Sequence, residues 1–361
     1  MKQPSPTQTR GSREGHLNHT GCDCLKKKRI LIPLAILIVY VTIALLPKPM
    51  VNEDNPFLRE DTDMPFLIAH GGGNREFPDN TLEAFYNAYF VDPDVMMETD
   101  VSITNDDVVI LSHDLTLDRK TSLKNAVISE IDYADLMADE INFGYQNSVE
   151  DGINTSGDLV RYENYLGETV TPLDVTYPEG IEARHESKFL ATTLEELITA
   201  FPDNYINVEI KQTGDIGLEA LNAVIELMED LDDEYDTFSR IVLASFHDAI
   251  YEALLDIKEN DHPELMLSPG MNGAALFYGL QLMRLNLFYA KPVTVLQIPT
   301  DYSIFNLTTS HLIEQAHNHG IAVHYWTIDD EDTMERLIEL GVDGIMTNYP
   351  SKLKTVYDTY E

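Results

Sequence analysis

Two stretches of the chain carry side chains whose types and spacing could do chemistry. In the first, an apolar run of strand type leads into His70, which three glycines follow. In the second, Glu98 and Asp100 lie two residues apart, so on a strand both carboxylates point to the same face. His113 follows a further apolar run. Carboxylates that converge with histidines suit a divalent metal ion flanked by acid–base groups.

These side chains belong to a series of short motifs. In chain order the motifs are His70, Pro78-Asp79-Asn80-Thr81, Glu98-Thr99-Asp100, His113-Asp114, Leu117-Asp118-Arg119, Val208-Glu209-Ile210-Lys211, Trp326-Thr327 and Gly341–Pro350. Through these motifs, residues 64–355 resemble the glycerophosphodiester phosphodiesterase family. The resemblance implies a metal-dependent hydrolase whose substrates are small glycerophosphodiesters, such as glycerophosphocholine or glycerophosphoethanolamine. Its products would be glycerol 3-phosphate and an alcohol.

The resemblance also assigns roles to the central residues. It implies that His70 and His113 act as general acid and base, and an imidazole can do either because it titrates near neutrality. It implies that Glu98, Asp100 and Glu209 are metal ligands. Three carboxylates suit one hard divalent cation, Mg²⁺ or Ca²⁺, and no His/Cys cluster has the spacing of a mononuclear zinc site. The alternative for the acidic pair is a structural ion pair, although basic residues are scarce here.

Two further residues are candidates for substrate binding. Lys211 lies two residues after Glu209, so both side chains point to one face of the predicted strand. Lys211 is expected to neutralise phosphate charge, to hold Glu209 in a salt bridge, or to do both. The single tryptophan, Trp326, is expected either to form a wall against the glycerol moiety, as the resemblance implies, or to pack in the core.

The sequence departs from the family at Gly71, where the family has an arginine that contacts phosphate. Two replacements are open: the Arg75 side chain, four residues on, and the backbone N–H groups of the three glycines that begin at Gly71. The aspartate that the family carries near the end of the chain is Asn348 here, for which a structural role is expected.

The order of apolar runs predicts the fold. Runs of strand type alternate with helical patterns, which is typical of a parallel α/β protein. The predicted strands are Phe66–His70, Val95–Ser102, Tyr205–Lys211, Ile241–Phe246, Glu264–Ser268, Val293–Pro299, Ala322–Ile328 and Gly344–Asn348. Eight strands with helices between them indicate a TIM (β/α)8 barrel over residues 65–361, with the catalytic residues at the carboxyl ends of its strands.

Helix boundaries and one insertion complete this prediction. Asn80 with Glu83, and Thr193 with Glu196, have the spacing of capping pairs. Residues 115–191, after the second strand, are too long for a simple connection and are expected to form an insertion near the barrel mouth. Its central part, 144–186, is either a lid that affects specificity or an ordinary surface loop.

Composition limits the partners. The chain has 24 basic and 62 acidic residues and a formal net charge of −38. Such a surface repels nucleic acid, which we exclude as a partner, and it repels anionic substrates, so phosphate capture depends on local positive charge. Both cysteines, Cys22 and Cys24, precede the predicted barrel, which therefore has no disulfide and no thiol nucleophile.

The N-terminal part predicts attachment to a membrane. A polar tail over 1–29, expected to be disordered, ends in the basic cluster Lys26–Arg29, and residues 30–47 contain no charge. This run is expected to be an uncleaved transmembrane signal anchor, with the N-terminus in the cytoplasm and the barrel outside. A cleaved signal peptide is the alternative. Residues 48–64 are expected to be a short polar linker.

Two other functions stay open. Attachment beside a bilayer suits a lysophospholipase D, or a sphingomyelinase D-like enzyme, acting on lysolipids or other membrane lipids. A noncatalytic surface binding protein on a decayed barrel is suggested only by Gly71, and the intact acidic and histidine motifs argue against it.

Overall fold

The computed structural model of the chain describes residues 20–46, 50–52, 54–59, 63–146, 148–149, 152–153 and 160–360. The chain divides into two compact units, Met1–Pro47 and Lys48–Glu361. In the first unit the described element is helix α1, Thr20–Leu45. Residues 1–19 of the predicted tail, residue 47 of the predicted anchor and parts of the predicted linker lie outside the described residues.

The predicted transmembrane anchor is not confirmed. Among the described residues, no helix is both long enough and apolar enough to count as a candidate membrane span. Helix α1 starts within the predicted tail and passes through the basic cluster before the apolar run begins. Its apolar part, 30–45, is shorter than the roughly 20 residues that cross a hydrocarbon core.

The second unit is built on a parallel sheet. Its strands, given in the order in which they pair, are β10 (Met266–Leu267), β9 (Ile241–Ala244), β8 (Ile206–Ile210), β2 (Met96–Ile103), β1 (Phe66–His70), β15 (Gly344–Thr347), β14 (Ala322–Tyr325) and β11 (Val295–Ile298). Each strand lies inside or overlaps one of the eight predicted ranges. The two outer strands approach each other where the Thr294 N–H donates to the Leu267 carbonyl at 2.9 Å. The sheet is therefore a nearly closed eight-stranded barrel, consistent with the predicted TIM barrel.

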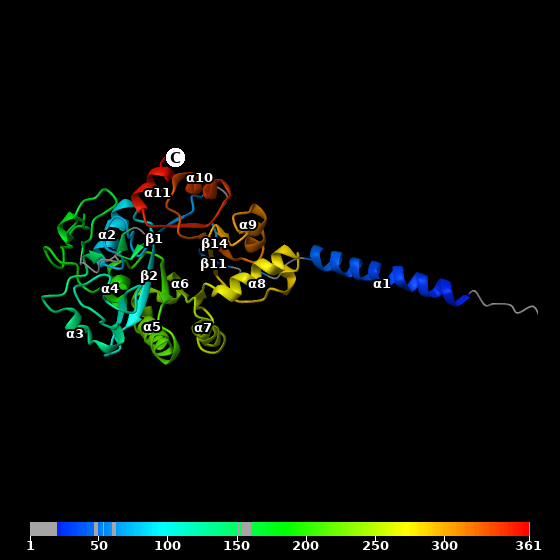
Figure 1. Cartoon of the computed structure of the whole chain (residues 1–361), viewed down its shortest axis with the longest axis horizontal. Coiled ribbons are helices and arrows are strands. Elements are labelled where there is room, and N and C mark those ends of the chain that lie inside the picture. Colours follow the sequence, from blue (N-terminus) through cyan, green and yellow to red (C-terminus); the bar gives the residue numbers. More distant parts are fainter. Residues whose placement is uncertain are drawn as a thin grey trace, which may run out of the picture. The chain divides into compact units, whose positions relative to one another are not determined.

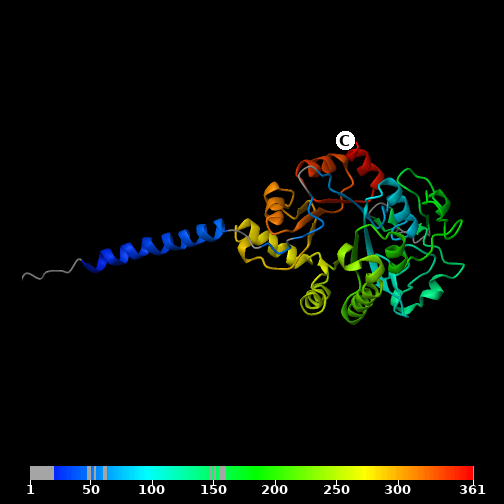
Figure 2. The ribbon, with the colours of Figure 1, turned by 180° about the vertical axis from the view of Figure 1, so that it is seen from behind.

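Helices surround this barrel. They are α2 (Leu82–Val91), α4 (Leu194–Ala200), α5 (Gly214–Tyr235), α6 (Thr237–Arg240), α7 (Asp248–Asn260), α8 (Met271–Leu282), η3 (Asn286–Phe288), α9 (Ser310–His317), α10 (Glu331–Glu339) and α11 (Pro350–Tyr357). In both ribbon views, α8 and α9 lie on the side of the barrel away from α2 and α4 (Figures 1 and 2). A hairpin of β12 (Asp301–Tyr302) and β13 (Phe305–Asn306) follows β11.

The amino ends of the barrel strands are closed by apolar side chains, and part of the predicted linker contributes to this closure. Phe57 is fully buried and packs with Ile68 and Met96 inside the barrel. The side-chain amide of Asn55 donates to the carbonyl oxygens of Thr294 and Gly320, at 2.7 and 2.8 Å. Residues 54–59 are therefore part of the folded unit and not a free spacer.

The insertion after β2 is made of short elements. They follow the short strand β3 (Val109–Leu111) and are η1 (Ile128–Glu130), α3 (Tyr133–Leu136), β4 (Tyr145–Gln146), β5 (Ser148–Val149), β6 (Gly152–Ile153), β7 (Val160–Arg161) and η2 (Pro172–Asp174). The Tyr162 hydroxyl donates to the Asn74 carbonyl at 2.9 Å, and the Tyr165 N–H donates to the Arg75 carbonyl at 2.8 Å. The insertion thus packs on the loop between β1 and α2, which carries the glycines after His70.

One of the two predicted capping pairs is correct. Thr193 and Glu196 form a reciprocal capping box at the start of α4. At the start of α2, however, Thr81 is the N-cap, and its side chain accepts from the Ala84 N–H. Asn80 lies one residue before this cap, with a positive φ of 56°. It is therefore not the N-cap of α2.

Candidate active site

Three carboxylates meet at the carboxyl ends of two neighbouring strands. Glu98 and Asp100 lie on β2 and Glu209 lies on β8, and the parallel register places Asp100 opposite Glu209. Because side chains alternate along a strand, Glu98 and Asp100 both point into the barrel mouth. One oxygen of each acid lies within 4.8 Å of the others, and all three residues are buried or nearly so. The structure thus brings the predicted metal ligands together.

The charge of this cluster fits a divalent cation. The Lys211 ammonium group lies 2.9 Å from an Asp100 oxygen and 2.8 Å from a Glu209 oxygen. With three carboxylates and one ammonium group, the cluster has a net charge of −2 when all four groups are ionised. Burial, and then the charge of Asp100, raise the pKa of Glu98 to about 7. Oxygen donors that repel one another in this way are suitable ligands for Mg²⁺ or Ca²⁺.

His70 ends β1 beside the carboxylates, with its Nε2 atom 3.9 Å from a Glu98 oxygen. Its Nδ1 atom lies 2.7 Å from the Asn348 Oδ1 atom, while the Asn348 amide nitrogen donates to Asp329 at 2.6 Å. The second bond fixes the amide orientation, so His70 Nδ1 carries a proton. Burial lowers the pKa of His70, but the nearby Glu98 and Asp100 carboxylates outweigh it, and the pKa lies above its usual value.

Asn348 contacts His70 directly, a role that its sequence position alone did not predict. The position of Asn348, directly after the last strand, could have indicated this contact. Because β15 pairs in parallel with β1, the carboxyl ends of the two strands meet. The expected structural role is also present, since its backbone N–H donates to Asp329 at 3.0 Å.

His113 reaches the mouth by a different route from the one predicted. It does not end a barrel strand, because β3 runs antiparallel to β2 as the returning arm of a hairpin. The Ser112 N–H donates to the Asp100 carbonyl at 2.8 Å, which brings His113 back to the level of the acids. Its Nδ1 atom lies 2.9 Å from Asp114. This hydrogen bond raises the pKa of His113 above its usual value, despite partial burial.

A second charged network supports this hairpin. Arg119 donates to both carboxylate oxygens of Asp79, at 3.0 and 2.9 Å, and to Asp114 at 2.5 Å. The Lys120 ammonium group donates to the Asp79 backbone carbonyl. Arg119 therefore links the loop after β1 to the loop that carries His113, and its charge is balanced by two carboxylates.

Asn80 is a further residue whose role the sequence did not reveal. Its positive φ turns the side chain toward β2, where its amide nitrogen donates to Asp100 at 3.0 Å. Its amide oxygen accepts from the Thr99 hydroxyl at 2.7 Å. Asn80 therefore orients Asp100, and the residue that resembled a helix cap positions a candidate metal ligand.

The glycine amides cannot replace the missing arginine. The Gly71 N–H donates to Glu98 at 2.8 Å, and the N–H groups of Gly72 and Gly73 donate to backbone carbonyls at 3.1 and 2.9 Å. All three donors are therefore already used within the fold, which rules out the predicted backbone anion site. Gly71 also has a φ of 55°, a conformation that a side chain such as arginine would strain.

The two remaining predicted residues lie beside different elements of the barrel. Arg75 is half-buried next to the insertion, and its N–H donates to the Asn348 carbonyl at 3.2 Å. Trp326 directly follows β14, and its ring lies 5.6 Å from the ring of Phe246 in an edge-on arrangement. Trp326 also borders a cavity of about 490 Å³. A contact of either side chain with substrate stays a prediction.

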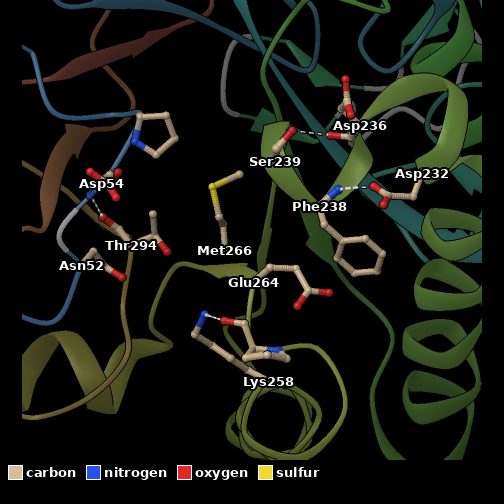
Figure 3. A pocket seen from close by; sticks show the side chains of 13 residues that line it. Asn52, Asp54, Asp232, Asp236, Phe238, Ser239, Lys258, Glu264, Met266 and Thr294 are labelled. Carbon is tan, nitrogen blue, oxygen red and sulfur yellow. Dashed lines mark hydrogen bonds between the residues drawn. The ribbon is translucent and has the colours of Figure 1, made fainter.

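Another cavity, of about 620 Å³, lies beside the amino ends of β10 and β11, where Met266 and Thr294 line it (Figure 3). The Phe238 N–H donates to Asp232 at 3.1 Å, and Lys258 donates to the Pro263 carbonyl at 2.8 Å. These bonds join helices and loops to one another. Glu98, Asp100 and Glu209 are not among the described residues that line this cavity, so it is separate from the candidate active site.

Comparisons with known proteins show what the chain is similar to. A model of the glycerophosphoryl diester phosphodiesterase family matches residues 70–352. A lysophospholipase D of Rattus norvegicus is 26% identical over 308 residues, which cover 80% of this chain and 84% of that protein. A glycerophosphodiester phosphodiesterase of Caldanaerobacter subterraneus is 26% identical over 297 residues, covering 80% of this chain and 95% of that protein.

Solved structures share the fold. A glycerophosphoryl diester phosphodiesterase domain from Mycobacterium tuberculosis has a TM-score of 0.58 at 16% identity, covering 81% of this chain and 99% of its own. A phosphodiesterase of Oleispira antarctica has a TM-score of 0.54 at 19% identity, covering 82% of this chain and 97% of its own. Because the family model spans well over half of the sequence, the chain belongs to the glycerophosphoryl diester phosphodiesterase family and is a phosphodiesterase.

Proposed function

We propose that the enzyme hydrolyses glycerophosphodiesters to glycerol 3-phosphate and an alcohol, and that it depends on one divalent cation, Mg²⁺ or Ca²⁺. The observation that carries this proposal is the convergence of Glu98, Asp100 and Glu209 oxygens within 4.8 Å, beside His70. These three carboxylates would hold the cation, which when bound supplies charge stabilisation to phosphate oxygens. The Caldanaerobacter relative, named for this activity, supports the same reaction.

The side chains of the enzyme divide the proton transfers between them. Neutral His70 carries its proton on Nδ1, toward Asn348, so its Nε2 lone pair faces the site and accepts a proton from the attacking water. His113, whose Nδ1 proton faces Asp114, donates a proton from Nε2 to the leaving alkoxide. The nearby Asp114 carboxylate favours the charged imidazole that this second step requires.

Positive charge at the mouth binds the phosphate group. The Lys211 ammonium group, held between Asp100 and Glu209, neutralises charge that builds up on the phosphoryl oxygens. We propose that Arg75 adds a second contact from the side of the insertion. Trp326 would form an apolar wall against the glycerol moiety.

Histidine variants test the proposal. His70→Ala and His113→Ala are each expected to reduce turnover of glycerophosphocholine by about 10²–10⁴-fold in the presence of Mg²⁺ or Ca²⁺. His311→Ala, an exposed histidine of α9, is the matched control and should retain turnover. Near-normal turnover in both active-site variants would contradict the proposed roles of His70 and His113.

A lysophospholipase D activity is the second candidate. Two observations favour it: the cavity beside Trp326 has a mostly apolar lining, and the Rattus norvegicus relative carries that name. Both activities would use the same carboxylates and histidines. Comparing lysophosphatidylcholine with glycerophosphocholine as substrates of the same preparation separates them.

The location of the enzyme stays a separate prediction. Lys26–Arg29 precede the apolar run, and by the positive-inside rule they predict a cytoplasmic N-terminus and an extracytoplasmic catalytic unit. Protease added to sealed cells expressing the full chain should degrade the catalytic unit; complete protection would contradict the prediction.

A further inference from the structure

An apolar cavity of about 490 Å³ lies next to the mouth of the barrel, between strand β11, helix α8 and the β12–β13 hairpin. This volume is within the range of about 300–1,000 Å³ that is typical of small-molecule sites. None of the residues described as lining it carries a charge, although a quarter of the chain is charged. A cavity without charges does not suit the phosphate or a charged head group.

Helix α8 is apolar on two different faces. Its inner face packs into the core through Phe277, which is fully buried and contacts the Tyr289 ring at 5.0 Å. Its other face lines the cavity with Met271, Ala275, Tyr278 and Leu282, which recur at helical spacing. A surface helix normally has one apolar face, which packs on the core. A second apolar face therefore indicates that a further apolar group packs against α8.

The hairpin adds an apolar rim, which we define as Met271, Leu282, Tyr302, Ile304 and Phe305. All five side chains are exposed, and Ile304 at the hairpin turn is 88% exposed. The Phe305 ring also contacts the Tyr278 ring across the cavity opening, at 5.7 Å. Exposed apolar side chains grouped around an apolar cavity mark the entry of an apolar ligand.

The inner end of the cavity meets the catalytic carboxylates. Phe246 and Gln297 line the cavity and also a small hollow that reaches Glu209. The Lys211 ammonium group lies 6.0 Å from the Phe246 ring. The buried Gln297 amide nitrogen has no hydrogen-bond partner among the described residues. A ligand that fills the cavity would therefore place its polar end beside Gln297 and its next polar group near Lys211.

We infer that this cavity binds the single alkyl chain of a glycerophospholipid substrate, with the glycerol at Gln297 and the phosphate at the carboxylates. This inference rests on the proposed phosphodiesterase function and names its substrate class, a one-chain phospholipid. The apolar lining binds methylene groups, and each methylene buried there should strengthen binding about fourfold. A deacylated diester would occupy only the polar end.

The position of Trp326 permits a direct binding test. It is the only tryptophan and borders the cavity, so its fluorescence reports occupancy without turnover. The probe is 12-bromododecanol, whose bromine quenches indole on contact, titrated into the full chain with chelator present. We expect saturable quenching, and affinity that rises about fourfold per methylene from bromooctanol to bromododecanol.

Two variants on the same helix sharpen the test. Gly279 lines the cavity, and a Cβ atom built there meets nothing within 4 Å, so a larger side chain can begin there, and the leucine of Gly279→Leu takes up part of the cavity. It also replaces a poor helix former, so the helix should persist. Gly279→Leu should weaken bromododecanol binding at least tenfold. Leu276→Ala, an exposed position of α8 outside the lining, should bind as the unmodified protein does.

A parallel assay measures the ratio of turnover on lysophosphatidylcholine to turnover on glycerophosphocholine, which should fall at least tenfold in Gly279→Leu. Absence of saturable quenching, or equal quenching in Gly279→Leu, would overturn the inference even if the enzyme hydrolyses glycerophosphocholine. Failure to hydrolyse either substrate would instead overturn the proposed function, and the quenching result would still decide whether the cavity binds alkyl chains.

Discussion

The Asn348→Ala variant tests whether a residue outside the reacting groups sets the chemistry of His70. In the structure the Asn348 oxygen accepts from His70 Nδ1 at 2.7 Å, and its orientation is fixed by the 2.6 Å bond to Asp329. Removing the amide frees the imidazole to rotate and to place its proton on Nε2, where it would block proton acceptance. We therefore expect a loss of kcat with little change in KM.

The size of this loss follows from the bond that is removed. A neutral hydrogen bond contributes about 0.5–1.5 kcal/mol, or roughly 2–13-fold in rate, and a populated wrong tautomer adds to it. Removing the outer partner of a metal-ligating histidine typically costs about 10–100-fold, and we expect a loss of kcat of the same order for His70. The same hydrogen bond raises the pKa of His70, so the acidic limb of the kcat/KM profile should move to lower pH.

Two further variants make the Asn348 result decisive. Asn87→Ala removes a half-buried amide that donates to Glu76 at 2.8 Å on α2, away from the acids, and should leave the pH profile unchanged. The double variant Asn348→Asp/Asp329→Asn exchanges the two partners, keeps an acceptor for His70 and should recover most of the rate. Unchanged kcat in Asn348→Ala, or no recovery in the double variant, would refute the reasoning.

Three other perturbations have expected outcomes of definite sign. Mg²⁺ or Ca²⁺ at 100 times its Kd should raise the free energy of unfolding by about 2.7 kcal/mol. Glu209→Gln should reduce this gain, which thermal unfolding with and without the cation measures. Equal stabilisation of the unmodified protein and the variant would count against the carboxylate site. Lys211→Met removes the ammonium group that competes for Asp100 and Glu209, so calorimetry should detect tighter cation binding while turnover falls about 10²–10³-fold; a fall in both would contradict the assigned role. Burial lowers the pKa of His324 to about 4, below its usual 6.5, so the unfolded chain binds more protons between these values and stability falls as the pH drops through that window, by up to roughly 3 kcal/mol. Urea unfolding of His324→Leu at pH 4.5 and 7 should lack this slope, and an unchanged slope would assign it to other groups.

The barrel was predictable because its strands are continuous apolar runs that recur between helices. The alternation rule also placed Glu98, Asp100, Glu209 and Lys211 correctly, since residues two apart on a strand share a face. Side-chain spacing along one strand is a local property, and the parallel pairing of β2 with β8 then brings the acids together.

Contacts that depend on backbone turns could not be read from the sequence. Asn80 has the spacing of a helix cap, but its positive φ directs the side chain to Asp100. His113 depends on a hairpin that returns to the mouth, and a sequence pattern does not give the direction of β3. Asn348 gains its role only because the first and last strands are neighbours. The sequence also suggested that the glycine N–H groups could bind phosphate, but in the fold they donate to Glu98 and to backbone carbonyls.

The central claim is that Glu98, Asp100 and Glu209 hold one divalent cation at the barrel mouth. Mn²⁺ accepts the same oxygen ligands as Mg²⁺ and Ca²⁺, and its anomalous scattering locates it in a crystal of the protein. We predict one anomalous peak between the three carboxylates, at distances typical of metal–oxygen bonds, and its loss in Glu209→Gln. A fully loaded crystal with no peak there, or with its only peak elsewhere, would contradict the account.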